Sequence, residues 1–233
     1  MQFPKIHNKG QAHLFKNRYL EYLTKSHPLV IWAMYVPMII FMLYHSAVKL
    51  DLNAAMIILA FIGGMFFWSL FEYIIHRFIF HFVAESERAL KIVYILHGNH
   101  HEYPRDKQRL IMPAVPSIIM ASVIFLVMHF IASVVGVEEA VFAFFPGFVL
   151  GYLIYATMHY AIHAWNPPFK WMKPLWRNHH LHHYKGHENG FGVSSTLWDH
   201  IFGTMFDLKK EKEDKEKVRD LMFVSRHPKE KVS

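Results

Sequence analysis

The chain has 233 residues, of which 53% are hydrophobic and 18% are charged, and its net charge is +7 with histidine neutral. This composition excludes a disordered protein, which would be rich in charge and poor in aromatic residues. The absence of cysteine excludes disulfides, thiolate zinc sites and cysteine-bound iron–sulfur clusters. The 19 histidines are the unusual feature, because an apolar chain seldom holds so many possible metal ligands.

The polar and basic residues 1–28 are expected to form an N-terminal arm. Within the arm, residues 11–25 are interpreted either as an interfacial helix with leucine and tyrosine on one face or as an ordinary exposed segment. The apolar run that follows is too long for the core of a signal peptide, and no small-residue cleavage pattern comes after it. We therefore interpret that run as a retained membrane span.

Four apolar runs dominate the chain. Each is about 20 residues or longer, which is enough for a helix to cross roughly 30 Å of hydrocarbon. Proline and glycine inside the runs are tolerated in membrane helices. Four such helices buried in a soluble protein would leave too little polar sequence to cover them. The sequence therefore predicts an all-α membrane protein with four transmembrane helices, over residues 29–48, 54–75, 111–135 and 140–162.

Lysine and arginine lie on one side of this predicted topology. The two short links between paired runs hold only Lys49, whereas residues 1–28 hold 5 of these cations, residues 76–110 hold 6 and residues 164–233 hold 13. The positive-inside rule places those three segments in the cytoplasm, and an even number of spans puts both termini on that side. Membrane topology thus explains the positive charge, and no nucleic acid partner is predicted.

Ten histidines form four clusters in the expected cytoplasmic segments or at the cytoplasmic ends of the second and fourth spans. Most cluster members are three or four positions apart, so they share a helix face and can aim at one point. His76 and His81 are five apart, which predicts that the helix is distorted or ends between them, with a π-type turn as one way to do so. Ionisable residues at membrane depth are usually functional. Since ten imidazoles exceed the capacity of one metal, the sequence predicts a dinuclear site formed by His76, His81, His97, His100, His101, His159, His163, His179, His182 and His183.

Ligating histidines need hydrogen-bond acceptors that fix their orientation. Glu72 precedes His76 by four residues and shares its face, so it is one candidate for this supporting role. Asp199 lies among apolar residues and is another, while Glu102 and Asp106 are either supporting groups or surface carboxylates. Asn99 and Asn178 are weaker candidates.

The other histidines are interpreted as structural or solvated. His180 is expected to point away from the face that its neighbours share. His187 and His200 are either supporting groups or surface residues. His45 and His129 lie in the first and third spans, away from the clusters.

Four segments that carry the clustered histidines resemble the fatty acid hydroxylase superfamily of membrane di-iron enzymes. The resemblance is closest to the fatty acid 2-hydroxylases that act on sphingolipid acyl chains, and it extends from about residue 60 to residue 206. The four clusters in this order, within these contexts, are highly specific. The segments are FEYIIHRFIFH, LHGNHHEYPRDKQRLIMP, GYLIYATMHYAIH and NHHLHHYKGHENGFGVSSTLWDHIFGT.

This resemblance implies four transmembrane helices and a cytoplasmic helical cap in which the ten clustered histidines hold two iron ions, for which zinc can substitute in purified protein. It implies O2-dependent hydroxylation at C2, the alpha carbon, of a long acyl chain of a ceramide or fatty acid. We expect this hydroxylase domain over residues 29–206, between the arm and a charged tail at 207–233. Because the 28 residues before the first span leave no room for the cytochrome b-type domain of many eukaryotic members, we expect a separate cytochrome b-type or ferredoxin-like electron donor.

Several alternatives stay open at this point. A related superfamily member would hydroxylate or desaturate a sterol, a carotenoid or a long-chain base. A membrane metal transporter would need ligands near the bilayer midplane and a polar path, and a zinc hydrolase usually keeps only three protein ligands. The compartment is expected to be a bacterial inner membrane or the endoplasmic reticulum, for which Lys229 and Lys231 resemble a retrieval signal.

Overall fold

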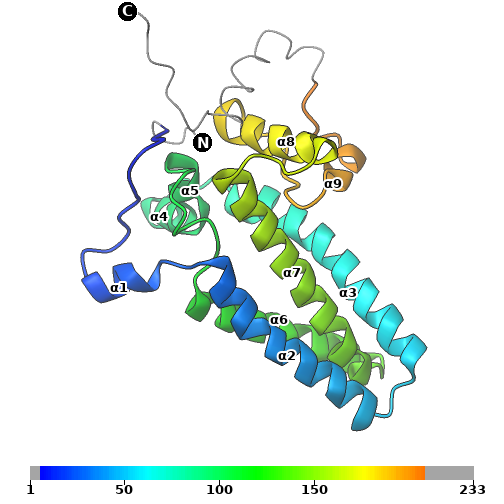
Figure 1. Ribbon diagram of the computed structural model, residues 1–233. Coiled ribbons are helices and arrows are strands. Elements are labelled where there is room, and N and C mark those ends of the chain that lie inside the picture. Colours follow the sequence, from blue (N-terminus) through cyan, green and yellow to red (C-terminus); the bar gives the residue numbers. More distant parts are fainter. Residues whose placement is uncertain (1–5, 208–233) are drawn as a thin grey trace, which may run out of the picture.

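The computed structural model describes residues 6–207, and its regular elements over that range are all helical. Four of its helices are long and apolar enough to cross a membrane, which confirms the predicted fold class. Figure 1 shows them as a slanted bundle below a group of short helices. The four long helices are α2 (Pro28–Val48), α3 (Ala54–Ile74), α6 (Ala114–Val134) and α7 (Val141–Ala164).

Local signals fix where the spans begin. The side chain of His27 accepts a hydrogen bond from Leu29 N, with Pro28 in the first turn, and Asn53 accepts one from Met56 N at the start of α3. The third span begins only at Ala114, after the extended Pro113, and not at residue 111 as predicted. The second span is longer than predicted, because a π-helix, η1 (Ile75–Phe80), continues α3.

The helices α3 and α7 pack against each other more extensively than any other pair. Glycines make this approach possible. A methyl group added at Gly64 would overlap the carbonyl oxygen of Phe144, and one added at Gly147 would overlap that of Phe61. Small residues bring helix backbones into close contact in membranes, where van der Waals packing drives association. The α3–α7 pair is therefore the rigid axis of the bundle.

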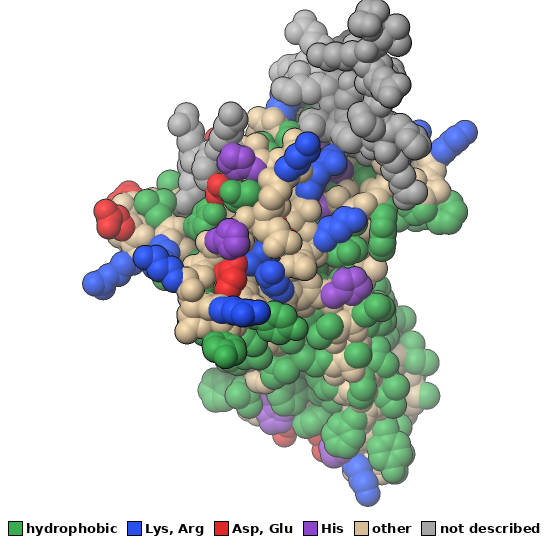
Figure 2. All heavy atoms as spheres, turned by 60° about the vertical axis from the view of Figure 1, so that its left-hand side comes forward, with side chains coloured by type: hydrophobic (Ala, Val, Ile, Leu, Met, Phe, Trp, Pro, Cys, Tyr) green, Lys and Arg blue, Asp and Glu red, His purple; other side chains and the backbone are tan. Residues whose placement is uncertain are grey.

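Short helices form the cap at one end of the bundle (Figure 1). Hydrophobic side chains cover most of the surface formed by the long helices, whereas Lys and Arg gather mainly at the cap end (Figure 2). After the arm, the short helices at the cap end are α4 (Glu87–Val93), η2 (Tyr94–Gly98), α5 (Asn99–Glu102), η4 (Lys170–Met172), α8 (Lys173–Tyr184) and α9 (Leu197–Ile201), whereas η3 (Glu138–Ala140) joins α6 to α7 at the other end of the bundle.

Of the two interpretations of residues 11–25, the helix holds for only part of the segment, because α1 spans Arg18–Leu23. Asn17 ends the possible continuation toward the N-terminus, because its side chain accepts hydrogen bonds from the amides of residues 19 and 20. The carboxylate of Glu21 binds the amides of Leu14 and Phe15, which holds the preceding segment as a loop. The predicted tail at 207–233, with its charged run at 209–220, lies almost entirely outside the described residues.

Hydrogen bonds dock this N-terminal arm on the segment that follows α5. Ala12 N donates to Asp106 Oδ2 at 3.3 Å, and Ser26 N donates to Gln108 O at 2.8 Å. Arg109 is buried between two carboxylates, because its guanidinium binds Asp106 at 2.8 Å and also Glu21. The arm is thus part of the cap.

Candidate metal centre

Two π-helices interrupt the elements that lead into the histidine site. The first, η1, lies between His76 and His81 and brings their ring centroids to 5.1 Å, which confirms the predicted distortion. Because a π-helix closes i to i+5, residues five apart fall on one face. The second, η2, ends one residue after His97 and was not predicted. Asn99 supports it, since its side-chain amide donates to Tyr94 O at 2.9 Å and Ile95 O at 2.8 Å.

The ten predicted histidines come together as two groups of five. Within each group, one nitrogen from every ring lies within 4.8 Å of the others. Nearly all of these rings are buried, at the end of the bundle where α3 and α7 meet the cap. Group A contains His76, His81, His97, His101 and His182, and group B contains His100, His159, His163, His179 and His183.

The histidine triplets are divided between the two groups. His97 and His101 belong to group A, whereas His100 belongs to group B. On α8 the division is reversed, with His182 in group A and its two neighbours in group B. Two rings of each triplet therefore aim at one point, as their spacing allows, and the assignment of the third ring to the other group was not predicted. A pair at i and i+4 lies about 40° apart on an α-helix, so the remaining ring is free to turn toward the other group.

Burial keeps the cap imidazoles neutral. Loss of hydration, followed by the neighbouring histidines, holds the pKa of six rings well below the ordinary value of 6.5. Metal ions bind the neutral imidazole, so these rings need no deprotonation before binding. The six are His97, His100, His101, His179, His182 and His183.

Backbone carbonyls fix the orientation of three of the rings. The Nδ1 atom of His182 donates to Asn189 O at 2.7 Å, that of His159 donates to Leu110 O at 2.7 Å, and that of His76 donates to Phe191 O at 2.5 Å. A carbonyl oxygen only accepts, so Nδ1 carries the proton in each of these neutral rings. The Nε2 atom of each ring consequently carries an unshared electron pair, and this atom faces into its group.

The ring nitrogens of each group are spaced like the ligands of one metal ion. In group A, His76 Nε2 lies 3.1 Å from His97 Nε2, and His182 Nε2 lies 2.9 Å from His81 Nε2. Two imidazole nitrogens bound at right angles to one metal, each at about 2.1 Å, would be about 3.0 Å apart. In group B, His159 Nε2 and both nitrogens of His100 are buried without a hydrogen-bond partner among the described residues. The residues present therefore fit two metal ions.

Glu72 and Asp199 support the loop at residues 189–195 that supplies two of these carbonyls. Glu72 accepts hydrogen bonds from Val193 N at 2.9 Å and from Ser194 N at 2.8 Å. Asp199 accepts from the amides of residues 191 and 192, at 2.9 and 2.8 Å. The two carboxylates thus position the histidines one step further away than predicted, through the loop backbone. This role was not evident from the sequence, which does not show where a carbonyl points.

The other two predicted carboxylates hold the cap together at more distant points. Glu102 accepts a hydrogen bond from Tyr94 Oη at 2.7 Å, and Asp106 pairs with the buried Arg109. His180 lies outside both groups, as predicted, and its Nδ1 donates to Trp176 O at 2.6 Å. Asn178 donates to Asp199 at 3.4 Å, so it extends the same supporting network.

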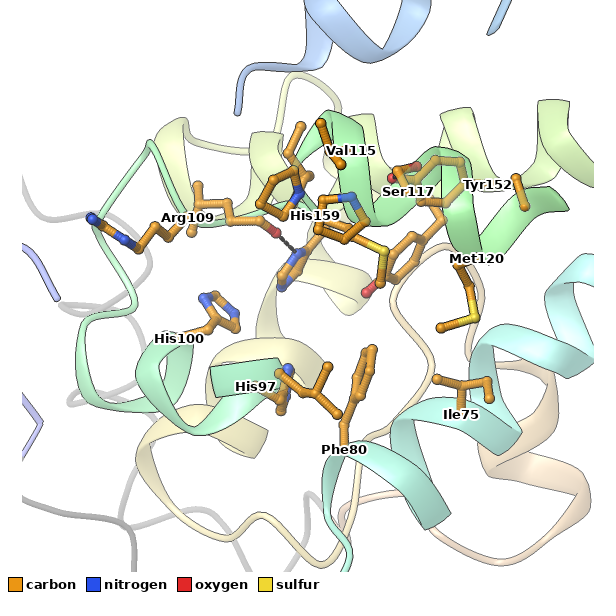
Figure 3. Close-up of a pocket in the computed structure, with 18 of the residues that line it drawn as sticks. Ile75, Phe80, His97, His100, Arg109, Val115, Ser117, Met120, Tyr152 and His159 are labelled. Carbon is orange, nitrogen blue, oxygen red and sulfur yellow. Dashed lines mark hydrogen bonds between the residues drawn. The ribbon is translucent and has the colours of Figure 1, made fainter. Parts of the chain in front are cut away.

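A cavity of about 500 Å³ lies directly beside the two groups, and its walls are almost entirely apolar. His97 of group A and both His100 and His159 of group B line its inner end. Figure 3 shows Phe80 beside His97, on which its ring stacks, and Ile75 and Met120 further from the histidines; the dashed line is the hydrogen bond between His159 and Leu110. The cavity is of the size that small ligands occupy in proteins.

The family model for fatty acid hydroxylases matches residues 61–204. The chain is 37% identical over 206 residues to the ceramide very long chain fatty acid hydroxylase of Saccharomyces cerevisiae, covering 86% of this chain and 51% of that one. It is 33% identical over 196 residues to a dihydroceramide fatty acyl 2-hydroxylase of Arabidopsis thaliana, covering 84% and 80%. The chain thus spans about half the length of the yeast relative.

A solved structure gives the same result in three dimensions. Full-length scs7p, in which only the hydroxylase domain is visible, superposes with a TM-score of 0.75 at 34% sequence identity, over 85% of this chain and 73% of that one. The family match begins within the second span, covers the third and fourth spans and includes all ten clustered histidines. The chain therefore belongs to the fatty acid hydroxylase family.

Proposed function

We propose that this protein is a membrane di-iron oxygenase that hydroxylates C2 of a long acyl chain, in a ceramide or related sphingolipid or in a fatty acid. The observation that carries this proposal is the apolar cavity whose inner end is formed by histidines of both groups. An acyl chain fits such walls, and C2 is then a carbon that can lie beside the imidazoles.

The reaction class decides which metal is expected. A C–H bond at C2 breaks, one oxygen atom of O2 enters as a hydroxyl group, and the other leaves as water with two electrons and two protons from a donor. Zinc has no redox chemistry, whereas two iron ions, held by group A and group B, would supply the oxidising power for this reaction. Imidazole suits iron as a ligand type. We therefore propose iron as the native metal.

Residues of this protein have three tasks in that reaction, some through the backbone and some through side chains. The carbonyls of Leu110, Asn189 and Phe191 hold the imidazoles in the metal-binding tautomer. Glu72 and Asp199 keep the loop that carries two of those carbonyls in place. The apolar lining of the cavity excludes water from the reacting carbon, which protects a reactive centre from side reactions.

The substrate class follows from two kinds of support. The named relatives from yeast and Arabidopsis act on ceramide or dihydroceramide acyl chains, and human fatty acid 2-hydroxylase is 38% identical over 149 residues. The cavity is lined by branched aliphatic and aromatic side chains, which suit a linear hydrocarbon. A sterol or carotenoid is not favoured, because none of these relatives is named for one.

We also propose that the cap and both termini face the cytoplasm and that a separate protein delivers the electrons. The distribution of Lys and Arg supports the orientation. Because the chain has no cysteine, single cysteines can report it. In sealed vesicles of known orientation, a membrane-impermeant maleimide should label Lys49→Cys and the cap variant Lys91→Cys from opposite faces, and labelling from one face would contradict this topology.

Lipid mass spectrometry tests the function. A host that makes the protein should accumulate 2-hydroxylated acyl chains, which the same host lacks when it makes the His100→Ala variant. The matched control is His45→Ala. His45 lies in the first span, away from the two groups, where it packs against Phe41 of the same span and Phe142 of the fourth. Iron content measured on the purified proteins should fall only in the first variant. Hydroxyl groups found on a sterol or long-chain base alone would overturn the substrate assignment.

A further inference from the structure

Part of the cavity wall is also exposed at the surface. Six apolar residues both line the cavity and expose between 43% and 52% of their surface: Leu20, Leu23, Ile79, Leu96, Val115 and Met120. They come from α1, η1, η2 and the first two turns of α6. A side chain that faces both the cavity and the outside marks the edge of an opening, so we call these six residues the rim.

The rim lies at the depth where the spans reach the cap. Leu23 is five residues before Pro28, the first residue of α2, and Ile79 is in the last turn of the second span. Val115 is the second residue of α6. All four segments therefore meet at the membrane boundary on the side of the histidine groups, where an exposed ring of aliphatic side chains would face acyl chains and not water.

The charged residues that line the cavity are engaged by other groups of the protein, so they do not hinder the binding of an apolar ligand. Among the lining residues of the described chain, only Glu72 and Arg109 are charged, and both are buried. Glu72 is engaged by the loop at 193–194, and Arg109 is held by Glu21 and Asp106. From the rim to His100 and His159 the path is therefore lined mainly by hydrocarbon.

We infer that the substrate enters this cavity sideways, from the bilayer leaflet on the side of the histidine groups, through a lateral opening framed by the rim. The occupant is the acyl chain of a lipid in that leaflet. This inference rests on the proposed function for its substrate, and it adds the route and the residues that control it. An acyl chain that enters at this depth keeps its polar end at the membrane surface, so C2 needs to move only a short way to reach the histidines.

Two pairs of exposed neighbours give matched variants. On the segment formed by α4 and η2, Leu96 lines the cavity, whereas Ile92, four residues earlier and 57% exposed, does not. On α1, Leu23 lines the cavity, whereas Tyr22, 75% exposed, does not. A lysine at each of the four positions adds the same charge to the same surface, but only Leu96→Lys and Leu23→Lys place it across the opening.

The probe is a ceramide with a photoreactive diazirine on its acyl chain, in vesicles that contain the full-length protein loaded with metal. In the wild type, the label should map by mass spectrometry to the cavity segments at 113–124 and 145–159. A lysine on the rim makes passage of hydrocarbon costly, so labelling of those segments should fall about tenfold or more in Leu96→Lys and Leu23→Lys. The Ile92→Lys and Tyr22→Lys proteins should stay close to the wild type, and metal content should be equal in all five.

Undiminished labelling in both rim variants would overturn the lateral opening, and so would equal losses in the rim and control variants. The outcome is separable from that of the proposed function. Labelling of the wild-type cavity without any 2-hydroxylated product would contradict the function and retain the opening. Normal product formation by both rim variants would contradict the opening and retain the function.

Discussion

The two sides of the transmembrane bundle are built in opposite ways. On one side, α3 and α7 approach so closely that Gly64 and Gly147 leave no space for a methyl group. On the other side, Ser117 is the one fully buried residue of α6. That serine joins α6 to its neighbours, because its hydroxyl lies 2.8 Å from Tyr35 Oη and 3.4 Å from Tyr152 Oη.

This difference matches the tasks of the two sides. The α3–α7 side carries His76, His159 and His163, whose positions must be held to a fraction of an ångström for metal binding. The α6 side borders the cavity and its rim, through which the proposed acyl substrate would pass. The tightly packed pair α3–α7 thus holds histidines in position, and the loosely packed α6 borders the opening of the cavity.

The largest expected effect is on the histidine groups, to which the tightly packed pair and the cap both contribute. His101→Ala removes a group A nitrogen, and we expect hydroxylation to fall by about 100-fold or more, with a loss of bound metal. Product formation and metal content should be measured on the same preparation, beside His45→Ala as the control. Full activity in His101→Ala would show that the geometry of group A is not needed.

Adjacent glycines allow the packing of the α3–α7 pair to be tested directly. Gly64→Ala places a methyl group against the backbone of Phe144, and we expect it to lower the free energy of unfolding by about 3 kcal/mol. Gly63→Ala places one 3.7 Å from the ring of Phe144, which is ordinary contact, and should be neutral or slightly stabilising. Thermal unfolding in detergent distinguishes the two. Equal stability of the two variants would mean that the close approach of these helices is not a source of rigidity.

Glu72 connects the rigid side to the histidine loop. Glu72→Gln keeps the shape but replaces the charged carboxylate by a neutral amide, so the hydrogen bond with the Ser194 hydroxyl must reverse its direction and the amides of Val193 and Ser194 lose a charged acceptor. We expect about 1–3 kcal/mol of destabilisation and faster loss of metal to a chelator. Ser69→Ala, on the same helix, serves as the control, since Ser69 bonds only Phe66 O and Trp198 Nε1 among the contacts described. Unchanged metal retention in Glu72→Gln would argue against a supporting role for the loop.

The smallest expected effect is a pH dependence on the open side. Burial raises the pKa of Glu21, but the amides of Phe15 and Leu14 and the charge of Arg109 outweigh it, so the pKa is lowered. His13, at 3.5 Å, acts in the same direction, while Asp106 shares the guanidinium. A lowered carboxyl pKa stabilises docking of the arm above pH 4.5, and that contribution is lost as the pH falls through the lowered pKa.

Hydrogen exchange of residues 11–26 measures this contribution, which we expect to be below about 1 kcal/mol. Exchange corrected for intrinsic rates should accelerate below pH 4.5 in the wild type. The Glu21→Gln protein should show no such step, because its arm is already weakened at neutral pH. A step of the same size in both proteins would assign the pH dependence to another group.

The features that were predicted correctly from the sequence are those that depend on the type and the spacing of side chains. Four apolar runs predicted four helices, and the separation of His76 from His81 predicted the π-helical turn. The histidine clusters predicted both the number of rings and their meeting place. These succeed because apolar length and helical periodicity are local properties that the membrane and the helix enforce.

The features that were missed depend on backbone direction and on long-range packing. The acceptors for His76 and His182 are carbonyls of residues 191 and 189, and a carbonyl has no signature in a sequence. The docking of the arm depends on Arg109, 88 residues from its partner Glu21, in a segment whose histidines and carboxylates were interpreted only in relation to the metal site. The length of α1 depends on Asn17, a residue type that caps helices and also occurs in loops.

The division of each histidine triplet has a mechanical consequence. One turn of α8 holds rings that belong to both groups, and so does the segment from His97 to His101. Since a helix is stiff, a movement of the segment that displaced the rings around one ion would also displace the rings around the other. We therefore expect two metal ions to bind cooperatively, so that a preparation short of metal contains full and empty molecules in preference to half-loaded ones.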